Sequence, residues 1–125
     1  MTQEDKELLL KDLCERLPYG VKAEKYTIRM DGELVPLANI EIVTAKDIIA
    51  QDKCPGYTIK PYLFPLSSMT KEQSKIYHEL VGGMFGTGVL INLEYLIDFF
   101  DRNHLDWRDI IPTGLAHDAT NKNIY

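Results

Sequence analysis

The chain has 125 residues, 45% of them hydrophobic and 26% charged, with a formal net charge of -5. This composition is ordinary for a globular protein and excludes wholesale disorder. The length suits one domain that buries roughly two-thirds of its unfolded surface, enough to fold without disulfides or a metal. The acidic balance argues against nonspecific nucleic-acid binding, which depends on a basic surface, so we expect no nucleic-acid partner.

The cysteines and the first residues indicate the compartment. Cys14 and Cys54 form no C-x-x-C or zinc-ligand pattern, and we expect Cys14 on the apolar face of the first helix as a small hydrophobe. The stretch 1–5 is acidic where a signal peptide would be basic, and no apolar run approaches the ~20 residues that span a membrane. We therefore expect a cytoplasmic protein with no membrane partner, no metal and no cofactor.

The N-terminal segment has the pattern of a helix. Thr2 can cap it, and acidic residues in its first turn suit the positive end of the helix dipole. Pro18 and Gly20 are expected to end it. The predicted inward stripe consists of Leu10, Leu13, Cys14 and Leu17.

From Val21 the apolar residues alternate, which is typical of a half-buried strand. Its predicted inner face consists of Tyr26, Ile28 and Met30. Asp31-Gly32 then favours a two-residue hairpin turn. The return strand would contain Leu34 and Leu37, a third strand would contain Ile40 and Ile42, and a short helical turn would span 45–51.

The next segment, 57–66, is extended and aromatic, and it is interrupted by Pro61 and Pro65. Each proline removes a ladder donor and keeps the preceding residue out of the helical region. The segment is therefore predicted to be an edge strand or a packed loop, not a central strand.

Two further helices are predicted. Thr70 and Gln73 match a capping box for a helix that runs to about Val81. Asn92 can cap a second helix, whose apolar residues Leu93, Leu96, Ile97 and Phe100 recur at helical spacing. The whole pattern predicts one α+β domain over residues 1–116, with a small antiparallel sheet of three or four strands and about three helices packed on one face. Residues 117–125 are predicted to be a polar, loose tail.

The glycine-rich stretch between the two helices, 82–88, invites a phosphate-loop interpretation. It lacks the following lysine, the preceding strand and the G-x-G-x-x-G spacing that phosphate loops require. A sharp turn between two helices is the stronger interpretation, because glycine reaches positive φ freely.

Catalytic motifs are missing. The acidic and histidine side chains His104, Asp106, Asp109 and His117 could be metal ligands or an acid/base set, but their spacing matches no recognised ligand motif, and Asp106 already has a role as a helix cap. The serines at 67–68 suit a helix start, no G-x-S-x-G occurs, and Cys54 has no activating neighbour in the sequence. These absences argue against an enzyme, although an active site built from distant residues stays open.

Large aromatic residues are candidates for a contact surface. Tyrosine, tryptophan and arginine are enriched at interface hot spots, although filling the core is the commoner role of such rings. The predicted interaction residues are Tyr57, Tyr62, Phe64, Trp107 and Arg108.

Three stretches carry a resemblance to known sequences. Residues 13–21 (LCERLPYGV), 59–70 (IKPYLFPLSSMT) and 103–111 (NHLDWRDII) resemble a group of small uncharacterised proteins encoded in gut-bacterial and phage genomes. The likeness covers most of the chain up to about Ala116 and is weakest in the hairpin region. It implies no catalytic or binding residue, but it favours a phage or mobile-element accessory protein, a class that often binds a host or phage component.

The favoured function is therefore a non-enzymatic interaction domain, which binds another protein or itself through the 57–64 edge and Trp107. The alternative is a small enzyme or ligand-binding domain, with a pocket between the sheet and the Asn92 helix and with His104, Asp106 and Arg108 at its mouth.

Overall fold

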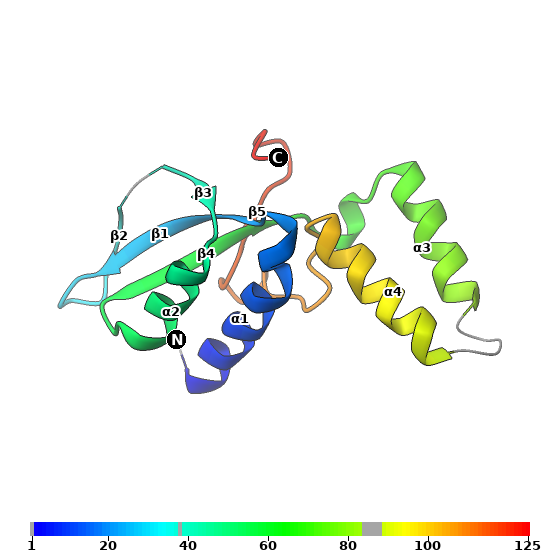
Figure 1. Ribbon diagram of the computed structural model, residues 1–125. Helices are drawn as coiled ribbons and strands as arrows, with labels where there is room; N and C mark the ends of the chain where they lie inside the picture. Colours follow the sequence, from blue (N-terminus) through cyan, green and yellow to red (C-terminus); the bar gives the residue numbers. More distant parts are fainter. Residues whose placement is uncertain (1, 38, 84–88) are drawn as a thin grey trace.

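The computed structural model describes residues 2–37, 39–83 and 89–125, and Figure 1 shows their arrangement. Within these ranges the chain forms helices and a sheet of short strands, so the predicted α+β class is confirmed. The α-helices are α1 (Gln3–Arg16), α2 (Ala45–Lys53), α3 (Lys71–Gly83) and α4 (Val89–Arg102). The strands are β1 (Lys22–Ile28), β2 (Leu34–Pro36), β3 (Glu41–Ile42), β4 (Tyr57–Leu63) and β5 (His117–Asp118).

The sheet has the strand order β2-β1-β4-β5, with β3 also paired to β1. β1 pairs antiparallel with β2, β3 and β4, whereas β4 and β5 run parallel, so the sheet is mixed and not antiparallel throughout. Helices α1 and α2 cover one face of it, and the α3–α4 hairpin stands beside one end (Figure 1).

β4 lies inside the sheet, and its prediction as an edge strand or loop was wrong at Tyr62 and Leu63, which pair with β5. Pro61 is tolerated in β4 because its nitrogen points away from β1. The N–H of Ile59 points away from β1, toward a side chain of α2. Since residues two apart in a strand point the same way, the nitrogen of Pro61 also faces away from β1, and the β1 ladder loses no hydrogen bond.

The buried face of α1 is rotated relative to its prediction. Thr2 caps the helix as predicted, in a capping box with Asp5, and the helix ends before Pro18. Leu9 and Leu13 are fully buried, whereas Cys14 is exposed, so its predicted place in the inward stripe was wrong. The inward face has the spacing i, i+3, i+4, i+7 and consists of Leu9, Asp12, Leu13 and Arg16.

The inner face predicted for β1 was also wrong. Tyr26 is buried, but it lies with Glu24 on the sheet face opposite to Ala23 and the helices. Met30 is fully exposed and Ile28 is more than one-third exposed, while Ala23 is buried under the helices. The hairpin turn is longer than predicted, because the N–H of Arg29 bonds to the carbonyl of Glu33 and leaves three residues, 30–32, in the loop. Gly32 has φ +85° there, which suits a three-residue hairpin with a left-handed residue.

Two apolar clusters fill the fold. The first lies between the sheet and helices α1 and α2, with Leu9, Leu13, Val21, Ala23, Val43, Ile59, Leu63, Ile110, Leu115 and Ala116 buried in it. The second joins the α3–α4 hairpin to the end of β4, with Leu96, Phe99, Phe100 and Leu105 buried and Phe64, Tyr77 and Trp107 packed against them. The main chain links the two, since Phe64 forms a parallel bridge with Leu105.

Helix α4 begins at Val89, so Asn92 lies inside the helix and its predicted role as the cap was wrong. The capping box predicted for α3 is confirmed by reciprocal hydrogen bonds between Thr70 and Gln73. Most of the glycine-rich segment, residues 84–88, lies outside the described residues.

The last nine residues differ from the predicted loose tail. His117 and Asp118 form β5, and Ala119 is buried. The hydroxyl of Tyr125 accepts a hydrogen bond from the N–H of Lys22 at 2.8 Å and donates one to the carbonyl of Tyr62 at 2.7 Å. The segment is thus part of the folded body.

Candidate functional site

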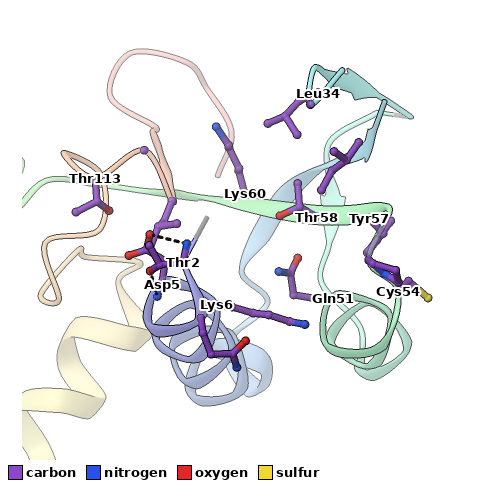
Figure 2. A pocket seen from close by; sticks show the side chains of 16 residues that line it. Thr2, Asp5, Lys6, Leu34, Gln51, Cys54, Tyr57, Thr58, Lys60 and Thr113 are labelled. Carbon is purple, nitrogen blue, oxygen red and sulfur yellow. Dashed lines mark hydrogen bonds between the residues drawn. The ribbon is translucent and has the colours of Figure 1, made fainter. Parts of the chain in front are cut away.

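A groove of about 670 Å³ lies along β4 and is lined from both sides of that strand. Figure 2 shows Leu34 and Lys60 on one side of the strand and Lys6 and Gln51 on the other. The groove is lined by Thr2, Gln3, Asp5 and Lys6 of the first helical turn, by Ile28, Gly32 and Leu34 of the hairpin, by Gln51, Cys54 and Pro55 at the end of α2, by Tyr57, Thr58 and Lys60 of β4, and by Thr113, Gly114 and Leu115.

The backbone of β4 faces the groove with few free donors. The N–H of Tyr57 donates to the carbonyl of Cys54 at 3.2 Å, the N–H of Ile59 donates to Oε1 of Gln51 at 2.7 Å, and Pro61 has no N–H. The N–H and C=O of one residue point the same way in a strand, so the carbonyl oxygens of Tyr57 and Ile59 also face the groove. This edge therefore presents acceptors.

A buried hydroxyl adds a polar group to the same wall. Thr58 is only 3% exposed, and its Oγ1 has no hydrogen-bond partner among the described residues. Buried polar groups in proteins are nearly always hydrogen-bonded, because leaving one unpaired costs about 1–3 kcal/mol. A ligand group that bonds to Thr58 would remove this cost.

The charge of the groove is opposite to that of the whole chain. Its charged lining side chains are Lys6, Lys60 and Asp5, and the carboxylate of Asp5 accepts the Thr2 N–H in the capping box. Two cations and one carboxylate give the lining a formal charge of +1 on a chain of net charge -5, and the Lys6 ammonium donates to the carbonyl of Asp52 at 3.0 Å. A partner with carboxylate side chains would suit it.

A second cluster of polar residues lies on the sheet face that α1 and α2 leave uncovered, and it connects β1 and β4 to β5. Oε2 of Glu24 accepts hydrogen bonds from the hydroxyls of Tyr26 at 2.8 Å and Tyr62 at 3.1 Å. The Tyr26 hydroxyl also lies 2.8 Å from Nε2 of His117, whose ring stacks on Tyr62 with 4.8 Å between centroids. Each polar group is matched to another, which is the pattern of a structural network.

The pKa values in this cluster follow from its burial. Burial, then the hydrogen bond to Glu24, raises the pKa of Tyr26 and of Tyr62 above the usual value. Burial and then the charge of Lys60 lower the pKa of His117. At neutral pH both tyrosines keep their protons and His117 is neutral, so the cluster holds its hydrogen bonds without a net charge beyond that of Glu24.

The five predicted interaction residues do not form one surface. Tyr57 lines the groove, whereas Tyr62 is 6% exposed and belongs to the cluster under β5. Phe64 packs in the second core. Trp107 packs there too and borders a separate hollow of about 400 Å³, together with Pro65, Leu66, Ser67, Asp106, Asp109, Ile111 and Pro112.

Arg108 is buried in an ion-pair network. Its guanidinium bonds to Asp12 at 2.8 Å and to Glu15 at 2.5 Å, and it lies over the Trp107 ring at 4.1 Å. Arg16, from the same helix as the two acids, donates to the carbonyl of Leu105 at 2.6 Å. The network ties α1 to the 105–108 segment.

The alternative set of His104, Asp106 and Arg108 is likewise not brought together in one pocket. His104 stacks on Tyr125 with 3.8 Å between centroids. The predicted role of Asp106 as a helix cap was wrong, because no helix follows it among the described residues; its two carboxylate oxygens instead accept the backbone N–H groups of Ile110 and Ile111 in the loop, at 2.9 Å each. Each of the three side chains already has a contact that holds the loop after α4.

Sequence patterns could not reveal the groove. Its walls come from five separate segments, and its polar members, such as Gln51 and Thr58, have no motif spacing. Within the described residues, no three His, Cys, Asp or Glu side chains gather closely enough to hold a metal ion. A helix of the length and hydrophobicity needed to cross a membrane does not occur in that part of the chain.

Comparison with protein-family models, with curated proteins and with solved structures found no match to this chain. The geometry of the groove and of the clusters around it is therefore the basis on which a function can be inferred.

Proposed function

We propose that the chain is a non-enzymatic protein-interaction domain that binds an extended segment of a partner protein along the free edge of β4. The observation that supports this most is the groove itself, which lies along Tyr57–Lys60 and is lined from both sides of the strand. Addition of a strand to an exposed sheet edge is a common mode of peptide recognition, in which main-chain bonds provide affinity and alternate side chains provide specificity.

The shape of the groove suits a strand. The same edge of β4 already pairs with β5 at Tyr62 and Leu63. A partner strand beside Tyr57–Lys60 would therefore extend strand pairing along the rest of that edge. Side chains of a strand alternate between its two faces. One set would lie beside Thr58 and Lys60, and the other would meet Lys6 and Gln51.

Charge favours an acidic segment over a basic one. Lys6 and Lys60 lie on opposite sides of β4 in Figure 2, so carboxylates on either face of the added strand would find a cation. Complementary charge mainly raises the association rate and excludes wrong partners. A phage or mobile-element accessory role, implied by the sequence resemblance, is compatible with such a binding domain.

Selection from a displayed library of random peptides tests the proposal. We expect the selected peptides to be acidic and rich in β-branched residues, and to shift the amide resonances of Tyr57–Lys60 in the labelled protein. Substitution K60E should abolish binding, while K75E on the exposed surface of α3 should not. Selected peptides that shift only α3, α4 or the hollow beside Trp107 would overturn the proposal, as would a failure to select any.

The two cysteines provide an independent check. Both are exposed, but only Cys54 lines the groove. A fluorophore on Cys54 of a C14S variant should change its emission when a selected peptide is added. The same fluorophore on Cys14 of a C54S variant should not respond, and equal responses from both would place binding elsewhere.

A further inference from the structure

We infer that Gln51 is an internal substitute for the partner strand, and that the partner displaces it when it binds. This inference rests on the function proposed above. Gln51 belongs to the last turn of α2, is only 3% exposed, and places its Oε1 2.7 Å from the backbone N of Ile59. Figure 2 shows its side chain reaching from α2 toward β4.

The chemistry of the side chain fits this role. The carboxamide oxygen of glutamine is an acceptor of the same kind as a backbone carbonyl. It occupies the place that the carbonyl of a paired strand would take beside Ile59, at the usual N–H···O distance. An unpaired edge is a hazard that proteins cover, and here a single side chain covers it.

The rest of the edge leaves Ile59 as the point of exchange. Tyr57 already donates to Cys54 within the α2–β4 turn, and Pro61 has no N–H to offer. Of the N–H groups that the described stretch 57–61 turns toward the groove, that of Ile59 alone bonds to a side chain able to rotate away. A partner carbonyl can therefore replace Gln51 with no net loss of hydrogen bonds on β4.

This exchange sets the register of the partner. One carbonyl of the partner strand must lie opposite the N–H of Ile59. The N–H groups of the partner strand then meet the carbonyl oxygens on that edge of β4. Because the internal bond must first break, Gln51 weakens binding and keeps the edge closed in the free protein. Removing the carboxamide should therefore strengthen the binding of a peptide.

Hydrogen exchange in the free protein gives the first test. In a Q51A variant the amide of Ile59 should exchange much faster, while those of Thr58 and Lys60, which face β1, stay protected. Peptides selected on the wild type should bind Q51A about three- to tenfold more tightly, the effect of one net hydrogen bond. A Q73A variant, altered in the cap of α3, is the matched control and should bind them as the wild type does.

The wild-type protein provides a measurement that needs no variant to fold. The side-chain amide resonances of Gln51 should move toward solvent-exposed values when a selected peptide is added, while the Ile59 amide stays protected. If peptides bind at Tyr57–Lys60 but Gln51 does not move and Q51A gains no affinity, the displacement is wrong and the proposed function stands. A failure to select any peptide that binds at Tyr57–Lys60 would overturn both proposals.

Discussion

Arg16 and Asp12, one helical turn apart on α1, form an ion pair of 2.9 Å in which neither side chain is exposed. Breaking a buried pair typically costs about 3–5 kcal/mol. Asp12 keeps its second partner, Arg108, at 2.8 Å, which places the expected cost toward the lower end of that range. We expect R16M to lower the free energy of unfolding by about that amount, as measured by urea denaturation. The loss should be enlarged by the carbonyl of Leu105, which Arg16 also satisfies.

The chain contains a matched control for this pair. Asp98 and Arg102 on α4 have the same residue types, the same spacing and the same 2.9 Å distance, but the Arg102 side chain is 65% exposed. An exposed pair contributes about 0–1 kcal/mol. R102M should therefore leave stability almost unchanged, and equal effects of the two substitutions would contradict the importance assigned to burial.

The stability of the fold should fall in mild acid because of His104. Burial and then the charge of Arg16 lower the pKa of His104 to about 4, against about 6.5 in the unfolded chain. The unfolded state thus binds the proton first, so the stability contributed by neutral His104 is present above about pH 6.5 and is lost as the pH falls toward 4. Denaturation curves measured between pH 7 and 4 should show this decline.

The substitution H104N isolates the effect. His104 has φ +57°, a left-handed conformation that asparagine tolerates well. The variant should lose much of the decline between pH 6.5 and 4 but keep the part that comes from His117, whose pKa is also lowered. An unchanged pH profile, or an NMR titration of His104 near 6.5, would contradict the prediction.

Local signals in the sequence predicted local structure well. The cap at Thr2 and the capping box at Thr70 depend on residues three positions apart, and the end of α1 depends on Pro18. Such contacts lie within one turn of helix, so a single short window contains both partners. The α+β class follows because the helical and alternating stretches are clearly separated.

Features that depend on distant partners were missed for a common reason. Asp12 and Arg16 look solvent-facing because each is charged, yet each finds its partners in the folded core. The place of β4 inside the sheet depends on β5, which lies more than fifty residues later. The groove depends on Gln51 and Lys6 meeting β4 from two different helices, and no pattern within one segment records that encounter.

The rotated face of α1 gives a direct comparison of two neighbouring residues. Leu13 is fully buried and Cys14 is exposed. L13A should destabilise the protein by about 2–5 kcal/mol, because it leaves a cavity in the first core. C14S should change stability by no more than about 0.5 kcal/mol, as surface substitutions usually do. Thermal denaturation of both variants checks this, and a large effect of C14S would restore the inward stripe that the sequence predicted.

Glu24 should control how firmly β5 is held. Its carboxylate accepts the hydroxyls of Tyr26 and Tyr62, and Tyr26 in turn contacts His117 on β5. E24A leaves both buried hydroxyls without this acceptor, at a cost of about 1–3 kcal/mol. The amide of Ala119, which bonds to the carbonyl of Leu63 beside β5, should then exchange faster.

The comparison that decides this prediction is with E33A, since Glu33 is exposed in the hairpin and pairs with Arg29 across the turn. Its removal should leave the Ala119 amide as protected as in the wild type. Because the lost bonds are local to β5, the amides of β1 that pair with β4 should stay protected in both variants. Uniform acceleration of all sheet amides by E24A would mean that Glu24 supports the whole sheet, and slow exchange at Ala119 would mean that the stacking of His117 on Tyr62 alone holds the strand.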